Sequence, residues 1–142
     1  MKTSLSDRLG LTAPIIQAPM SGADCPRLAA AVSEAGGLGM LALWRSPPDE
    51  LRDRIRETKT LTRRPFGVNL NLGWPQEERL EVCLEEKIPI VSFFWGDPGH
   101  LIDRAHRTGA TVLHSVSSAE EARRVVDLGA DVVVAQGWES GG

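Results

Sequence analysis

Residues 130–142 read Ala-Asp-Val-Val-Val-Ala-Gln-Gly-Trp-Glu-Ser-Gly-Gly. The apolar run at 132–135 is typical of a strand buried on both faces of a parallel sheet. It ends at a polar residue, Gln136, which the strand would hold rigidly at its carboxyl end. Glycines in the loop that follows would let backbone N–H groups approach a ligand closely. The pattern therefore predicts a ligand site here, with a loop that contains Gly137, Gly141 and Gly142.

Upstream of this stretch, apolar segments recur at a steady spacing along the whole chain. Predicted strands begin near residues 14, 38, 66, 89, 111 and 131, about 20 to 28 residues apart, and a helical pattern fills each interval. Six repeated strand–helix units indicate an α/β protein with a parallel sheet. Two folds fit this pattern, the doubly wound sheet and the (β/α)8 TIM barrel.

Turn and capping residues predict where the intervening helices begin. Asp24 is expected to cap the first one, and Ser46 the second, with Pro47 as its first helical residue. The pair at 74–75, Trp-Pro, is expected to open the third helix, and Ser118 with Glu121 forms a capping box for the last. In the first helix the apolar spacing predicts an inner face made of Leu28, Ala31, Val32 and Ala35.

Residues at the strand ends separate the two folds. The phosphate-binding glycines of a doubly wound dinucleotide domain are absent, because Pro19 and Met20 occupy that position. Polar side chains end nearly every strand instead, as expected where many strands contribute to one barrel mouth; they are Gln17, Asn69, Ser92, His114 and Gln136. A complete barrel takes about 250 residues. We therefore expect residues 1–142 to be the N-terminal portion of a single TIM-barrel domain, incomplete after about six units.

Bulk properties narrow the class of protein further. The chain has 142 residues and a formal net charge of −3, with no basic cluster beyond Arg63 and Arg64, so nothing favours nucleic-acid binding. No apolar run has the length of a signal peptide or a membrane span, and a cytoplasmic location is expected by default. Cys25 and Cys83 lack metal-ligand spacing and are predicted to be buried thiols.

Four blocks of sequence resemble the nitronate monooxygenase family, also called the 2-nitropropane dioxygenases. They are residues 14–20 (PIIQAPM), 29–39 (AAAVSEAGGLG), 64–70 (RPFGVNL) and 129–142. The resemblance extends over the whole chain from about Leu9. Flavin-type enoyl-ACP reductases share the same blocks, so the resemblance indicates the superfamily more firmly than the substrate.

The resemblance implies an FMN-dependent TIM barrel and suggests which residues meet the flavin. The segment Ala18, Pro19, Met20 and Ser21 would lie against the isoalloxazine ring, and Asn69 would form a hydrogen bond to it. Gln136 and Gly137, with the loop at Gly141 and Gly142, would approach the ring and the ribityl phosphate. His114 ends a predicted strand and is expected to point to the barrel mouth, either as a flavin or substrate contact or as a structural histidine. Trp95 and Trp138 also end strands there and either wall a substrate pocket or pack against neighbours.

For activity, the resemblance implies oxidation of alkyl nitronates by FMN and reoxidation of the reduced flavin by oxygen. A neutral nitroalkane would first need a base, which in the family is a histidine directly after the Gly-Gly pair and would follow Gly142. One alternative is an NAD(P)H-dependent enoyl-ACP reductase on the same scaffold. Another is a truncated, non-catalytic fragment, whose apolar edge strands could pair with a second copy as a homo-oligomer.

Overall fold

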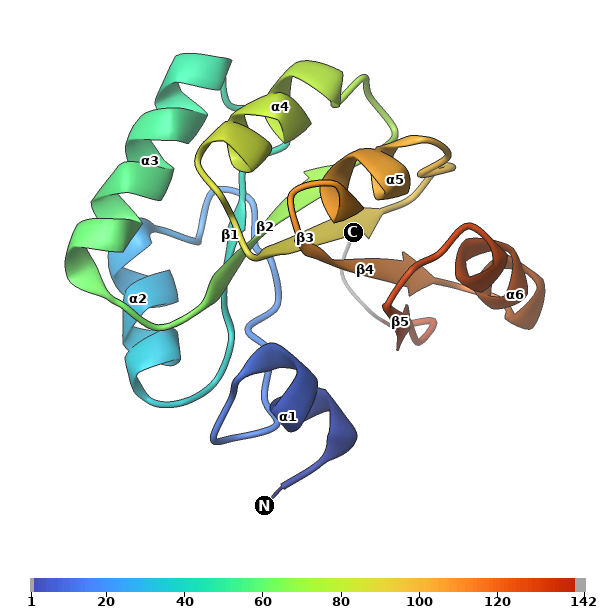
Figure 1. The fold of residues 1–142 in the computed structure, drawn as a ribbon, viewed down its shortest axis with the longest axis horizontal. Coiled ribbons are helices and arrows are strands. Elements are labelled where there is room, and N and C mark those ends of the chain that lie inside the picture. Colours follow the sequence, from blue (N-terminus) through green and yellow to red (C-terminus); the bar gives the residue numbers. More distant parts are fainter. Residues whose placement is uncertain (1, 140–142) are drawn as a thin grey trace.

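A five-stranded parallel sheet forms the centre of the protein (Figure 1). The structure, a computed structural model, describes residues 2–139. Its strands pair in the order of the sequence without reversal, as in a barrel and unlike a doubly wound sheet. The α/β fold class of the TIM-barrel type is thus confirmed. The strands are β1 (Gly39–Ala42), β2 (Phe66–Asn71), β3 (Ile90–Phe94), β4 (Thr111–Val116) and β5 (Val132–Ala135).

The strand predicted to begin near residue 14 is wrong as a full strand. It forms only an isolated parallel bridge between Ile16 and Leu38. The N–H of Leu38 donates to Ile15 O, and the N–H of Gln17 donates to Leu38 O, both at 2.9 Å. Prolines at 14 and 19 lack an N–H, so they cannot extend the hydrogen-bonded ladder at either end.

A helix that the sequence patterns did not predict, α1 (Ser4–Leu9), lies on the side of the sheet away from α3 to α5 (Figure 1). Thr3 and Ser6 cap its first turn reciprocally. Leu9 and Leu11 pack there with inward-facing residues of three strands, namely Met40, Ile90 and Leu113. The remaining helices are α2 (Pro26–Glu34), α3 (Pro48–Leu61), α4 (Glu77–Glu85), α5 (Leu101–His106) and α6 (Ala119–Asp127).

Asp131 attaches α1 and α5 to the start of β5. Its carboxylate accepts from Arg8 and the Val112 N–H and lies 2.9 Å from His106 Nε2. Burial alone would raise the pKa of Asp131, but the hydrogen bonds from Val112 and His106 and the nearby Arg8 charge hold that pKa below its ordinary value.

The predicted starts of three helices are wrong. Cys25, not Asp24, precedes α2, and the Asp24 carboxylate instead accepts a hydrogen bond from the Ala42 N–H at the end of β1. Helix α3 begins at Pro48, one residue later than predicted, and α4 begins at Glu77 rather than at the Trp-Pro pair. The cap predicted at Ser118 is confirmed, because its side chain accepts from the Glu121 N–H. The predicted capping box is not, because the Glu121 carboxylate accepts from the Ser117 N–H instead of the Ser118 N–H.

The inner face predicted for α2 is also wrong. Its buried residues are Pro26, Ala29, Ala30 and Ser33. A Cβ built on Gly39 would lie 1.9 Å from Ala29 O, so α2 touches β1 backbone to backbone. Only small residues permit that approach, and the apolar residues at 28–32 cover too much of the helix for periodicity to choose a face.

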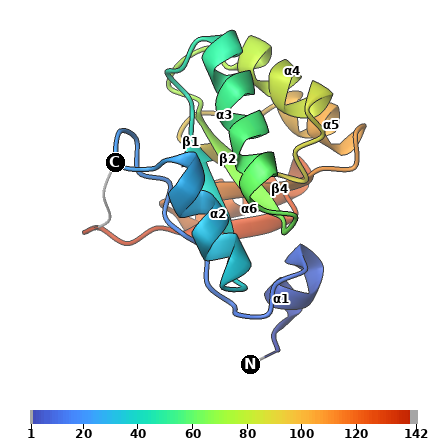
Figure 2. The same ribbon diagram turned by 90° about the vertical axis from the view of Figure 1, so that its left-hand side faces the viewer.

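Helices α2, α3 and α4 stand side by side over the outer face of the sheet (Figure 2). Their buried residues join those of β2 and β3 in the main core, which includes Leu51, Ile55, Val68, Leu80 and Phe93. Beside it, Glu86 accepts from Lys59, Arg52 and Arg56. Burial would raise the pKa of Glu86, but these three hydrogen bonds hold it below its ordinary value.

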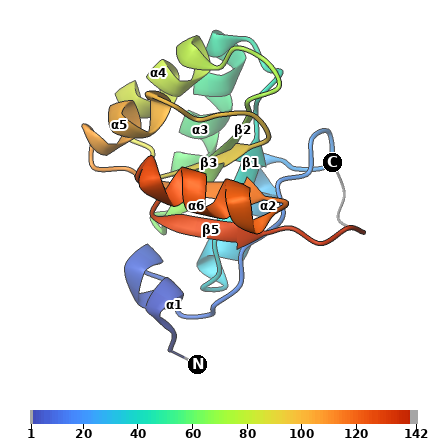
Figure 3. The ribbon, with the colours of Figure 1, turned by 90° about the vertical axis from the view of Figure 1, so that its right-hand side faces the viewer.

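Strand β5 differs from the other strands, and the prediction that it is buried on both faces is wrong. It pairs with β4, and α6 packs along it (Figure 3). Val134 and Ala135 remain exposed because no described residue pairs with its other edge. Of the two cysteines, Cys83 is buried as predicted and burial raises its pKa to about 12, whereas Cys25 is exposed. Among the described residues no helix is long and apolar enough to cross a membrane.

Candidate functional site

A cleft of about 660 Å³ opens where the strands reach their carboxyl ends. We call it the central cleft. Its lining comes from the segment after the Ile16 bridge and from the ends of all five strands, an arrangement typical of barrel active sites. The lining residues are Ala18, Pro19, Met20, Ser21, Ala42, Trp44, Asn69, Asn71, Phe94, Ser115, Val134, Ala135, Gln136 and Gly137.

The structure brings together most of the residues that the sequence proposed for the site. Seven of them line the central cleft, from three separate parts of the chain: Ala18, Pro19, Met20, Ser21, Asn69, Gln136 and Gly137. Gly141 and Gly142 lie outside the described residues. His114 is the described site candidate that the cleft does not include.

The segment 18–21 forms an apolar lip of the central cleft. Gln17 anchors its start, because Nε2 donates to Met40 O at 3.0 Å. At its other end, Met20 O accepts from the N–H groups of Ala23 and Asp24, both at 2.9 Å, in a tight turn. Met20 itself is 40% exposed, which leaves it able to contact a ligand.

Asn69 contributes a buried amide from the middle of the sheet. Its Nδ2 donates to the backbone O and the Oγ of Ser92, each at 3.3 Å, which fixes the side chain toward β3. Its Oδ1 accepts no hydrogen bond from the residues of 2–139. Because a buried amide needs partners on both its atoms, this oxygen is available to an N–H donor of a ligand.

Gln136 and Gly137 close the central cleft at the end of β5. The Gln136 N–H donates to Val116 O at 2.9 Å, so β5 and β4 stay paired up to the point where the loop begins. A second, smaller cleft of about 330 Å³ shares both residues and is walled by Trp95 and Trp138. Trp138 is 98% exposed, so among the described residues it has almost no packing role.

The orientation predicted for His114 is wrong. Along β4, Val112 packs in the core under the helices, whereas Leu113 packs on the inner side with α1. Because side chains alternate along a strand, His114 faces the helices with Val112, and Ser115 faces the cleft. His114 is fully buried and its Nε2 lies 3.9 Å from Glu121 Oε1 of α6.

The buried His114 ring is not the hydrogen-bonded histidine that the alternative interpretation required. Neither ring nitrogen has a hydrogen-bond partner in the described part of the chain. Burial lowers the pKa of His114, and the nearby Glu121 and Asp97 charges only partly oppose this. The neutral ring is therefore the favoured form at neutral pH.

Sequence reasoning missed several lining residues that strand alternation could have identified. Asn71 lies two positions after Asn69, on the same face of β2, and lines the same cleft. Ser115 lies two positions after Leu113, on the inner face of β4, and also lines it. Phe94 and Trp44 were missed because nothing in their local sequence distinguishes an apolar residue in a site from one in the core.

The central cleft has an unusual charge balance for a catalytic site. Among the described lining residues there is no Asp, Glu, His, Lys, Arg or Cys. Polar contacts can come only from amides, hydroxyls, the Trp44 indole and the backbone. These residues can therefore hold and orient a ligand, but no side chain among them is a general base at neutral pH.

Comparison with known proteins places this architecture in a family. The sequence profile described as nitronate monooxygenase matches residues 2–78 and 71–142. A nitronate monooxygenase from Paraburkholderia phytofirmans is 37% identical and aligns with 99% of this chain and 50% of its own length. The (3aS,4S,5R,7aS)-5-hydroxy-7a-methyl-1-oxo-octahydro-1H-indene-4-carboxyl-CoA dehydrogenase of Rhodococcus jostii is 36% identical, over 100% of this chain and 40% of the relative.

A solved structure, FabK from Thermotoga maritima, superposes with a TM-score of 0.97 at 43% identity, covering 100% of this chain and 46% of that one. The chain thus spans about half the length of the proteins it matches. Because the family profile covers both halves of the sequence, the chain belongs to the nitronate monooxygenase family.

Proposed function

We propose that the protein containing this chain is an FMN-dependent oxidoreductase that oxidises alkyl nitronates with oxygen. In this proposal the central cleft is part of the flavin site, and residues 18–21, Asn69, Gln136 and Gly137 contact the cofactor. The observation that carries it is the convergence of these residues, from distant parts of the chain, on one cleft. Membership of the nitronate monooxygenase family supports the reaction class.

The chemistry of the cleft fits a flavin. A planar ring needs flat apolar surfaces, which Pro19, Met20 and Phe94 can supply, and a few polar partners at its edge. The Asn69 oxygen can accept from a ring N–H, and Gln136 offers an amide on the other side. A volume of about 660 Å³ lies within the usual range for cofactor pockets.

When bound, FMN would supply the redox chemistry, taking electrons from the nitronate and returning them to oxygen. The residues of this chain would contribute by positioning the ring and shielding it from water. Asn69 and Gln136 would orient the ring, and the apolar lip at Pro19 and Met20 would exclude water from it. A nitronate is already deprotonated, so it needs no base from a cleft whose described side chains offer none. We therefore expect nitronates to react faster than the neutral nitroalkanes.

A second candidate function is NAD(P)H-dependent reduction of an enoyl thioester on the same flavin scaffold. The close superposition on FabK favours it. The similarity to a carboxyl-CoA dehydrogenase also suggests a thioester as substrate.

Two assays on the full-length protein, purified with FMN, separate these candidates. If the protein oxidises nitronates, it should consume oxygen with the nitronates of nitroethane or 1-nitropropane, without NADH. If it reduces enoyl thioesters, it should oxidise NADH only when a crotonyl thioester is present. Activity only in the second assay would reject nitronate oxidation.

The third candidate, a non-catalytic fragment, concerns the 142-residue chain alone. Ile15 and Val134, at the two sides of the sheet, are 63% and 37% exposed, and exposed apolar edges favour pairing with a second copy. Size-exclusion chromatography with an FMN titration tests this. A monomer that binds FMN stoichiometrically would contradict the fragment interpretation, whereas a colourless oligomer would support it.

A further inference from the structure

Two tryptophans and an arginine form a stack beside the central cleft. Trp44 follows β1 and Trp74 follows β2, and their rings stack with centroids 4.6 Å apart and planes at 28°. The Arg45 guanidinium lies over the Trp44 ring at 4.2 Å and 5.5 Å from the Trp74 centroid. We call this arrangement the Trp–Arg stack. It lines a separate cleft of about 510 Å³, the side cleft.

The side cleft adjoins the central cleft. Trp44 lines both of them, so a ligand in the central cleft needs to extend only past this one ring to reach Arg45. Both clefts lie at the carboxyl ends of the strands, where a barrel enzyme binds its substrate. The Trp–Arg stack is therefore placed to contact the end of a substrate that is remote from the flavin.

Buried hydrogen bonds hold this region in place. Gln76 is 1% exposed, and its Nε2 donates to Trp44 O at 3.2 Å and to Asn71 O at 2.9 Å, which links the loops after β1 and β2. Arg79 Nε donates to Ser46 O at 2.8 Å and ties the same loop to α4. The stack is thus built on a fixed support, so little ordering is needed when a ligand binds.

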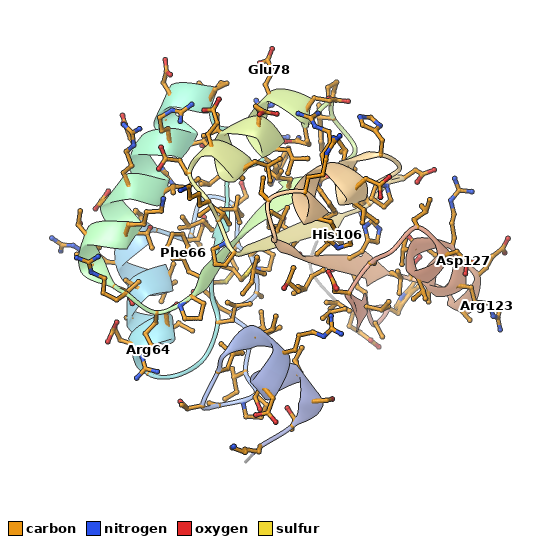
Figure 4. The ribbon with its side chains drawn as sticks, in the orientation of Figure 1. Arg64, Phe66, Glu78, His106, Arg123 and Asp127 are labelled. Carbon is orange, nitrogen blue, oxygen red and sulfur yellow. The ribbon has the colours of Figure 1, made fainter. Side chains whose placement is uncertain are left out.

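Among the described residues of the side cleft, Arg45 is an arginine whose N–H donors no protein group uses. Arg79 donates to backbone oxygens, whereas Arg45 makes no hydrogen bond or ion pair with any residue of 2–139. Stacking uses the face of the guanidinium and leaves its N–H edge open to a ligand. Glu77 and Glu78 also line this cleft, but both are exposed and the Glu78 side chain points outward from α4 (Figure 4).

We propose that Arg45 is a specificity-determining residue that binds an oxyanion, a carboxylate or a phosphate, at the end of the substrate remote from the reacting carbon. A stacked guanidinium with a free edge matches the bidentate geometry of either oxyanion. The proposal rests on the function proposed above only for the identity of the substrate. Binding of the oxyanion itself needs no turnover.

The test is direct binding to the full-length protein with FMN present. Propionate, propyl phosphate and uncharged 1-propanol are titrated separately, and the ¹⁵N-labelled indole signals of Trp44 and Trp74 report occupancy next to Arg45. We expect at least one of the two anions to bind about tenfold more tightly than the alcohol. The tighter of the two identifies the oxyanion as carboxylate or phosphate. Equal affinities for all three compounds would overturn the proposal.

Arg45→Gln removes the charge, and Arg63→Gln is the matched control, because Arg63 is exposed on the loop before β2. We expect Arg45→Gln to weaken anion binding about tenfold and leave alcohol binding unchanged, with Arg45→Lys between. Unaltered anion binding in Arg45→Gln would also overturn the proposal.

If the anions bind through Arg45 but no nitronate is oxidised, the proposed function fails and this inference stands. If nitronates are oxidised while Arg45→Gln has no effect on binding, the reverse holds.

Discussion

Strands β3 and β5 have similar sequences and different surroundings. Ile-Val-Ser-Phe-Phe in β3 and Val-Val-Val-Ala in β5 are both apolar runs typical of a buried parallel strand. In β3 the first four residues are buried, because β2 and β4 pair with its two edges. In β5 no residue is fully buried, and β4 is its one neighbour among the described strands.

The comparison shows that an apolar run predicts a strand that can be buried, whereas the neighbouring strands determine how much of it is buried. The exposed half of β5 also contributes to the candidate site, since Val134 and Ala135 line the central cleft. Buried positions in the core of the sheet should therefore contribute more to the stability of the protein than exposed positions at the end of β5. Matched substitutions in these two regions test this difference.

The largest effect is expected for Gly39→Ala in β1. The new Cβ would lie 1.9 Å from Ala29 O and force α2 away from the sheet, at a cost of about 3 kcal/mol in the free energy of unfolding. The control is Gly137→Ala after β5, where the nearest atom would be 3.8 Å away and the expected change is within about 0.5 kcal/mol. Urea unfolding measures both, and equal effects would contradict the comparison.

A smaller difference is expected between two valines. Val91 in β3 is 0% exposed, so Val91→Ala should lower the free energy of unfolding by about 2 kcal/mol. Val134 in β5 is 37% exposed, and the same change there should cost less than about 1 kcal/mol. If Val134→Ala proved as destabilising as Val91→Ala, β5 would be covered by contacts that the described residues do not provide.

The smallest expected effect concerns pH and His114, on the strand between these two regions. Burial lowers its pKa in the folded state below the ordinary value of 6.5, so below that pH the unfolded chain binds more protons. His114 therefore lowers the free energy of unfolding as pH falls below about 6.5, by at most about 1.4 kcal/mol per pH unit. His114→Leu should remove this slope and His100→Asn, at an exposed position, should keep it. If the free energy of unfolding had the same pH slope in the wild type, His114→Leu and His100→Asn, the slope would not come from His114.

Much of the fold followed from sequence alone because strand spacing and apolar runs are local signals. The strands from β1 to β4 were predicted in this way. Helix α1 was missed because its capping box uses Ser6 instead of an acidic residue. The face of α2 was misassigned because the backbone contact between Gly39 and Ala29 is a tertiary feature that periodicity does not encode.

The site was predictable to the extent that it depends on strand ends. Asn69 and Gln136 interrupt or end apolar runs, and Met20 follows Pro19 just after a predicted strand end. The parallel sheet brings such strand ends to one edge. His114 also appeared to end a strand, but β4 continues to Val116, so His114 lies inside it and faces the helices. The Trp–Arg stack joins two loops 30 residues apart. No local pattern links those loops, and only the folded structure brings them together.

An FMN titration of the full-length protein, followed by flavin absorbance and fluorescence, tests most directly whether the central cleft is part of a flavin site. We expect one FMN per chain in the wild type. We also expect affinity about tenfold weaker in Asn69→Leu, which loses the amide in the central cleft, and unchanged affinity in His114→Leu, because residue 114 faces the helices. A wild-type protein that binds no FMN, or one whose affinity depends on His114 and not on Asn69, would contradict that role of the cleft.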